Sequence, residues 1–100
     1  MKIFIDSADV SAIKEAYETG LIDGVTTNPT LIMKSGRHPE QVYQELIDLG
    51  INDVSMEVVG NAETMIADGR RLFNKFGKAA TIKVPCTPDG LLACKQLSRE

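Results

Sequence analysis

Short runs of apolar residues recur along the chain, and each is followed by a longer segment with helical spacing. The runs that predict strands are residues 2–6, 24–28, 54–59 and 79 or 80 to 85. Between them apolar residues recur three and four positions apart, as at Val42, Leu46 and Leu49, which is typical of an amphipathic helix. Strand and helix patterns in such alternation predict an α/β protein with a parallel sheet.

Glycine and proline mark the expected ends of the helical segments. Gly20 and Gly77 follow the first and third segments, where glycine commonly ends a helix. Pro39 and Pro88 stand in the first turn of the second and fourth segments, where proline is well tolerated. The third helix is expected to turn one apolar face inward, made of Ile66, Leu72, Phe73 and Phe76.

Two architectures fit repeated strand–helix units: a doubly wound open sheet and a (β/α)₈ barrel. A barrel of roughly 250 residues uses about 31 residues for each of its eight units. The 100 residues of this chain supply about 25 for each of four units, which is lean but compatible. Four units are half of a barrel.

Composition places the chain among ordinary globular proteins of one domain, with 43% hydrophobic and 25% charged residues. The net charge is −3 and there is no basic stripe, so nucleic acid is not an expected partner. No apolar stretch approaches the ~18 residues of a membrane span, and no signal-peptide core is present. Cys86 and Cys94 lie eight positions apart and read as reduced thiols, which predicts a cytoplasmic protein.

Lys83 stands in the middle of the last apolar run, Thr81 to Pro85. Burying an unpaired ammonium group costs on the order of several kcal/mol, so a lysine in a buried strand tends to lose its proton. A neutral lysine is a nucleophile that forms Schiff bases with carbonyl substrates. The ordinary alternative is a lysine that reaches water from the strand edge or pairs with a carboxylate.

The alternation of side chains places three more polar residues on the face of Lys83. Residues two apart in a strand share a face, so Asp6, Asn28 and Glu57 lie opposite the apolar positions of their strands. They fall toward the C-terminal ends of the strands, where α/β barrels keep their chemistry. Each also has an ordinary explanation, as helix cap, turn residue and charge partner of Lys83 respectively. Their convergence on one rim favours a functional site.

An amine, two carboxylates and an amide suit cleavage of a carbon–carbon bond near a ketone. Neutral Lys83 would attack the ketone and lose water, and the resulting iminium withdraws electrons so that a retro-aldol step becomes feasible. Asp6 and Glu57 would divide the proton transfers. The amide of Asn28 can both donate and accept a hydrogen bond, which suits the orientation of a sugar hydroxyl.

Several stretches carry a resemblance to a known family: Phe4–Ala8, Gly24–Thr30, Met56–Val58, and Thr81–Pro85 with Gly90 and Leu91 after it. In order and spacing they resemble the small transaldolase and fructose-6-phosphate aldolase family. The resemblance covers essentially the whole chain, and the Thr-Thr-Asn-Pro and Lys-Val-Pro runs are its most specific parts. It implies a TIM (β/α)₈ barrel of which only the first four units are present, so that residues 1–100 form its N-terminal half.

The resemblance also implies roles for individual residues. Lys83 matches the Schiff-base lysine, and Asp6 matches the acid/base that acts on the hydroxyl released in C–C cleavage. Asn28 matches the residue that binds the dihydroxyacetone portion of the substrate. Thr26 and Glu57 match the pair that holds the water used in imine formation.

The implied reaction belongs to the pentose phosphate pathway. It transfers a dihydroxyacetone unit from sedoheptulose 7-phosphate or fructose 6-phosphate to glyceraldehyde 3-phosphate or erythrose 4-phosphate. In the branch that acts as a fructose 6-phosphate aldolase the position of Glu57 carries glutamine, so glutamate favours transaldolase. The alternatives are that aldolase activity, or a catalytically silent half-barrel.

Partners and cofactors are implied as well. Small-molecule sugar phosphates are the expected ligands, homo-oligomeric rings are common in the family, and no metal or organic cofactor is expected. The family supplies its phosphate-gripping arginine and serine from strands five to eight, beyond residue 100. Ser35-Gly36-Arg37 is too short for a phosphate loop and predicts a turn.

Overall fold

The computed structural model describes all residues from Met1 to Glu100. One parallel sheet in the order β1-β2-β3-β4 comprises β1 (Phe4–Asp6), β2 (Gly24–Thr26), β3 (Val54–Glu57) and β4 (Ala80–Lys83). The helices are α1 (Val10–Glu18), α2 (Pro29–Lys34), α3 (Pro39–Asp48), α4 (Ala62–Phe76) and α5 (Pro88–Ser98), and a 3₁₀ turn, η1 (Gly77–Ala79), precedes β4. None of the helices is long and apolar enough to cross a lipid bilayer.

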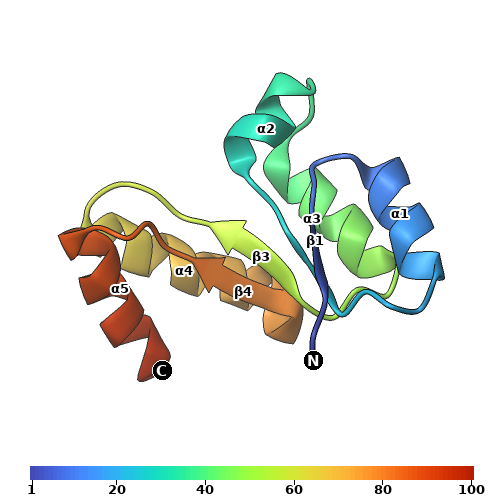
Figure 1. Ribbon diagram of the computed structural model, residues 1–100. Coiled ribbons are helices and arrows are strands. Elements are labelled where there is room, and N and C mark those ends of the chain that lie inside the picture. Colours follow the sequence, from blue (N-terminus) through green and yellow to red (C-terminus); the bar gives the residue numbers. More distant parts are fainter.

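The helices lie on one side of the sheet, and the short helix α2 sits beyond the C-terminal end of β2, beside α3 (Figure 1). A single core cluster joins residues from each helix, such as Ile13 of α1 and Ala93 of α5, to Val25 and Met56 of the central strands. The strands follow one another in chain order without a reversal. A doubly wound sheet reverses its strand order and carries helices on both faces. The α/β fold is therefore the one predicted for consecutive units of a (β/α)₈ barrel.

The predicted alternation of side chains is confirmed. Val25, Val54 and Met56 are fully buried beneath the helices, and Ile82 packs against the same core. On the opposite face no helix covers the strands, and Phe4 remains 39% exposed. This second face is called the open face below.

Side-chain caps mark the starts of α1, α4 and α5. The carboxylate of Asp9 accepts hydrogen bonds from the backbone N–H groups of Ser11 and Ala12 at the start of α1. Asn61 caps α4 and Thr87 caps α5 in the same manner. Such caps satisfy N–H groups that have no partner inside the helix. Because Asp9 caps α1, the carboxylate of Asp6 is not needed for that purpose.

The strands are shorter than the sequence predicted, and one helix was not anticipated. β2 ends at Thr26 instead of residue 28, and α2 begins at Pro29. The side chain of Asn28 caps this helix, and proline at the first position has its φ angle already set for a helix. An Asn-Pro pair after a strand therefore started a helix where a turn was expected.

The inward face predicted for α4 is wrong at one residue. Met65, Gly69, Leu72 and Phe76 are buried, whereas Phe73 is 51% exposed. Successive helical residues are turned by about 100°, so Phe73 lies at the flank of the buried face on which Met65, Leu72 and Phe76 are centred.

An ion-pair cluster joins α3 to α4 and predicts a pH effect on stability. Glu40 accepts hydrogen bonds from Arg71 at 3.0 Å and Lys75 at 2.8 Å. The Arg71 hydrogen bond and then that of Lys75 lower the pKa of Glu40 to about 2. A lowered folded-state pKa stabilises the fold above the unfolded value of 4.5, and this stabilisation disappears as the pH falls toward 2.

Glu40→Gln is therefore expected to lower the free energy of unfolding at pH 7 by about 1 kcal/mol, since both cations are half-exposed and screened by solvent. Urea denaturation at pH 7 and at pH 2.5 measures the difference from the wild type, which should shrink at the lower pH. Glu15→Gln in α1 is the control, because Glu15 is exposed and forms no ion pair. An equal loss at both pH values would contradict the assignment.

Candidate functional site

The strand register arranges polar side chains on the open face in two rows. Asp6, Thr26, Ser55 and Thr81 are successive partners across the four strands and form the lower row. Glu57 and Lys83 are partners one step closer to the C-terminal ends of the strands. Asn28 follows Thr26 by two residues and extends this upper row on the side of β2.

The upper row brings an amine beside a carboxylate. The Nζ atom of Lys83 lies 4.0 Å from Oε2 of Glu57. The backbone holds this pair in register, because the N–H of Val58 donates to the carbonyl of Lys83 at 3.0 Å. Neither side chain is engaged in another ion pair. A separation of 4.0 Å exceeds a hydrogen bond, so one water or a small rotation is needed to pass a proton.

Lys83 is not buried as the apolar run predicted. Its side chain is 43% exposed, and that of Glu57 is 22% exposed. The apolar neighbours Ile82 and Val84 do pack on the core, but they point to the helices, whereas Lys83 points to the open face. An apolar run shows that one face of a strand is covered, and it does not show which side chains lie on that face.

The side-chain amide of Asn28 caps α2 with its oxygen and leaves its nitrogen free. Its Oδ1 accepts hydrogen bonds from the N–H groups of Thr30 at 2.9 Å and Leu31 at 3.4 Å, which caps α2. The Nδ2 group makes no hydrogen bond within the chain and is left as a donor. The sequence predicted that this amide would both donate and accept hydrogen bonds in the site. Because Oδ1 is used by the cap, only donation from Nδ2 remains.

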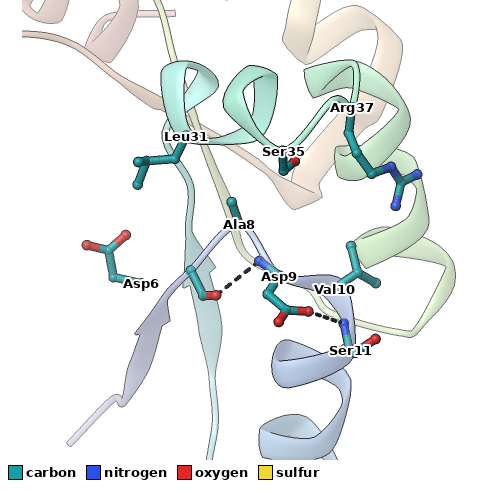
Figure 2. Close-up of a pocket in the computed structure, with 9 residues that line it drawn as sticks. Asp6, Ala8, Asp9, Val10, Ser11, Leu31, Ser35 and Arg37 are labelled. Carbon is teal, nitrogen blue, oxygen red and sulfur yellow. Dashed lines mark hydrogen bonds between the residues drawn. The ribbon is translucent and has the colours of Figure 1, made fainter.

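Asp6 is exposed at the edge of an open hollow of about 650 Å³ (Figure 2). The hollow lies between the β1–α1 connection and the end of α2, and Ser7, Ser35 and Arg37 also line it. Arg37 is paired with both carboxylate oxygens of Glu45, and its hydrogen bonds lower the pKa of Glu45. The guanidinium is thus committed to α3, and Ser35–Gly36 form the predicted turn.

The predicted site residues lie on, or just after, four adjacent strands. Glu57 and Lys83 are register partners in the upper row, and Asn28 follows β2 on the same face. Asp6 stands on β1, three strand spacings from β4, which is about 14 Å along the sheet. The curvature of the sheet and the length of the lysine side chain bring the Asp6 carboxylate and the Lys83 amine closer together than this strand-to-strand distance.

One polar pair on the open face was missed by the sequence analysis. Thr81 donates a hydrogen bond of 2.6 Å to the carboxylate of Asp53, directly below Lys83 on β4. The signal was available, since residue 53 shares its parity with 55 and 57, but the predicted strand began at residue 54. Thr26 lies half-buried between Asp6 and Ser55, where the register predicts it.

The arrangement supports proton transfer beside an amine nucleophile. The amine of Lys83 is open to solvent, the carboxylate of Glu57 can exchange a proton with it through one water, and the amide of Asn28 can donate to an oxygen nearby. No three His, Cys, Asp or Glu side chains lie close enough together to hold a metal ion.

Comparison with known proteins agrees with these motifs. A family model described as transaldolase/fructose-6-phosphate aldolase matches residues 3–100. The chain is 50% identical over 101 residues to a protein of Dinoroseobacter shibae named "Probable transaldolase", covering 100% of this chain and 46% of that protein. Proteins of the same name from Cereibacter sphaeroides and a Ruegeria species are each 52% identical, with 46% and 45% of their lengths covered.

The chain thus spans about half the length of the curated relatives that it matches. The family match extends through all four strands and includes every residue of the two polar rows. The chain belongs to the transaldolase/fructose-6-phosphate aldolase family.

Proposed function

We propose that this chain carries the Schiff-base machinery of a transaldolase. The reaction moves a dihydroxyacetone unit from a ketose phosphate, such as fructose 6-phosphate or sedoheptulose 7-phosphate, to an aldose phosphate, such as erythrose 4-phosphate or glyceraldehyde 3-phosphate. The observation that carries the proposal is the exposed amine of Lys83 at 4.0 Å from the carboxylate of Glu57. The name shared by its relatives, "Probable transaldolase", supports the same reading.

The first half of the reaction forms the imine. The ammonium of Lys83 loses a proton to Glu57, directly or through water, and the free amine attacks the ketone carbon. The carbinolamine then loses its hydroxyl as water, with a proton returned by Glu57. Thr26 lies in the row below Glu57, and in this proposal it holds the water that takes part. The donor group of Asn28 binds an oxygen of the dihydroxyacetone portion.

The second half breaks and remakes a carbon–carbon bond. Asp6 takes the proton from the hydroxyl on the carbon that will become the aldehyde. The carbon–carbon bond breaks, its electrons flow into the iminium, and the aldehyde leaves. The enamine left on Lys83 attacks an acceptor aldehyde, and Asp6 returns the proton to the new alkoxide. Hydrolysis of the imine frees the ketose product. Proton and electron balance close without any oxidant or reductant.

The identity of residue 57 favours transfer over simple cleavage. A carboxylate accepts and returns protons, whereas an amide in the same position only orients groups. Glutamate therefore favours transaldolase, and fructose 6-phosphate aldolase is the second candidate, since the family description includes both activities.

The complete reaction needs groups beyond these four strands. We place residues 1–100 as the N-terminal half of a barrel, with the phosphate-binding residues in the half that follows. β1 and β4 each have one strand partner, so a further strand or a second copy of the chain can pair with either edge. The free thiols Cys86 and Cys94 agree with a cytoplasmic location, and the proposed reaction belongs to the pentose phosphate pathway.

Reductive trapping tests the proposal. The chain, or a longer natural protein that contains it, is incubated with fructose 6-phosphate and borohydride, which reduces an imine to a stable amine. Mass spectrometry of peptides should find the added sugar on Lys83. Sugar on another lysine, or none in a folded protein, would refute the proposal.

Product analysis separates the activities. A transaldolase retains the dihydroxyacetone unit until erythrose 4-phosphate or glyceraldehyde 3-phosphate is added. Free dihydroxyacetone released without an acceptor would identify the aldolase instead. Trapping at Lys83 without turnover under either condition would identify a catalytically silent half-barrel, and sedimentation would show whether two copies associate.

A further inference from the structure

A buried threonine lies directly behind the candidate site. Thr27 is fully buried, and together with Ser55 it is one of the two buried polar residues of the chain. Its hydroxyl donates a hydrogen bond of 2.7 Å to the backbone carbonyl of Ser55 on the neighbouring strand. A buried hydroxyl is costly without a partner, so this side chain is held in one orientation.

The bond lies where β2 leaves the sheet. The registered pairing of β2 with β3 ends at Thr26 and Ser55. Asn28 then turns away to cap α2, which begins at the next residue. Beyond Thr26 the backbone register therefore no longer sets the position of Asn28 relative to β3. The Thr27 hydroxyl is the next polar contact between the two segments.

The residues on either side of this bond belong to the site. Thr26 and Asn28 flank Thr27 in the chain and face the open side, whereas Thr27 faces the helix layer. Ser55 precedes Glu57 by two residues on β3, and Glu57 pairs with Lys83. The bond thus ties the residue before Asn28 to the strand that carries Glu57.

Packing from the helix layer holds Thr27 in place. Tyr43 of α3 is 2% exposed, and its ring meets that of Phe76 of α4 edge-on at 5.9 Å. Burial raises the pKa of the Tyr43 phenol, and the nearby hydroxyl of Thr27 opposes the rise. The Thr27 hydroxyl therefore lies close to both the Tyr43 phenol and the carbonyl of Ser55.

We propose that Thr27 is a positioning residue for the transaldolase chemistry: its hydroxyl clamps the end of β2 to the Ser55 carbonyl and thereby sets the Asn28 amide against the Glu57–Lys83 pair. The inference rests on the proposed function. Thr27 touches no substrate and acts through Asn28.

Thr27→Val and Thr27→Ser make the matched test in the full natural protein. Valine keeps the shape of threonine and removes the hydroxyl, whereas serine keeps the hydroxyl and removes the methyl. Thr27→Val is expected to slow borohydride trapping of fructose 6-phosphate at Lys83, and kcat with it, by about 10²-fold, because displacement of a catalytic group by roughly 1 Å costs that much. Thr27→Ser should stay within about threefold of the wild type.

A core control distinguishes positioning from stability. Ile13→Val removes one methyl from a fully buried residue of α1, away from the site. Its trapping rate should equal that of the wild type at a temperature where thermal denaturation shows every variant folded. If Thr27→Val traps as fast as the wild type, or Thr27→Ser is as slow as Thr27→Val, the clamp has no positioning role.

A structural readout keeps this result separate from the proposed function. Nitrogen-15 NMR follows the side-chain amide of Asn28, and Thr27→Val should shift its resonances more than Thr27→Ser or Ile13→Val does. If the wild type traps no sugar at Lys83, the proposed function fails. The chemical shifts alone then show whether the Thr27 hydroxyl positions Asn28. Unchanged Asn28 resonances in Thr27→Val would then overturn this role.

Discussion

Lys83→Met is expected to abolish both sugar trapping and turnover in the natural protein that carries this sequence. Methionine matches the unbranched apolar stem of lysine as far as Cε but has no amine, so no imine can form. Removal of the nucleophile from a covalent mechanism costs on the order of 10⁶-fold in kcat. The strand should tolerate the change, because the side chain is 43% exposed and makes no hydrogen bond.

The measurement compares borohydride-dependent mass and aldehyde transfer in Lys83→Met with a matched control. Lys78→Met provides it, because Lys78 is an exposed lysine in the 3₁₀ turn before β4 and lies outside the two polar rows. Lys78→Met should trap and turn over like the wild type. If Lys83→Met still captures sugar and its thermal denaturation is unchanged, another amine forms the Schiff base.

Gly90→Ala is expected to have the largest effect on stability of any single-methyl addition in the chain. A Cβ atom at this position would overlap the carbonyl oxygen of Pro85 and lie 2.9 Å from its carbon. Both are backbone atoms, and Pro85 follows Lys83 by two residues, so the methyl can be fitted only by moving the end of the lysine strand. The cost should reach the upper part of the range of about 1–3 kcal/mol for overpacking.

For a domain of this size about 3 kcal/mol corresponds to a fall in Tm of roughly 12–24 °C, which calorimetry will measure. Gly69→Ala in α4 is the matched control, because its Cβ would meet the end of the Leu97 side chain at 2.8 Å. That side chain can move aside, and alanine favours the helix by about 1 kcal/mol. Similar Tm values for the two variants would show that the β4–α5 connection can relax.

Much of the arrangement of strands and helices could be predicted from the sequence because it depends on local periodicity. The two-residue alternation assigned Val25, Val54 and Met56 to the core and Asp6, Glu57 and Lys83 to the opposite face, as observed. Strand ends were less accurate, since the polar end of a strand carries no pattern of its own. The helix α2 escaped notice because Asn28 and Pro29 suit a turn as well as a helix start.

The exposure of Lys83 could not be predicted from the residues next to it in the sequence. Whether a strand residue is dry depends on what covers its face, and no segment of these 100 residues covers the open face. The commitment of Asn28 to α2 and of Arg37 to Glu45 was equally hidden. These partners lie only two and eight residues away in the chain, but which side chain a polar group meets depends on how the backbone turns between them.

The order of residues alone established the succession of strand–helix units, the family motifs and the face on which each polar side chain lies. Those features follow from periodicities of two and 3.6 residues, which every segment carries within itself. The folded chain established the strand register, the 4.0 Å approach of Lys83 to Glu57 and the bond of Thr27 to Ser55. Each of these joins segments at least twenty residues apart, and such distances are set by packing.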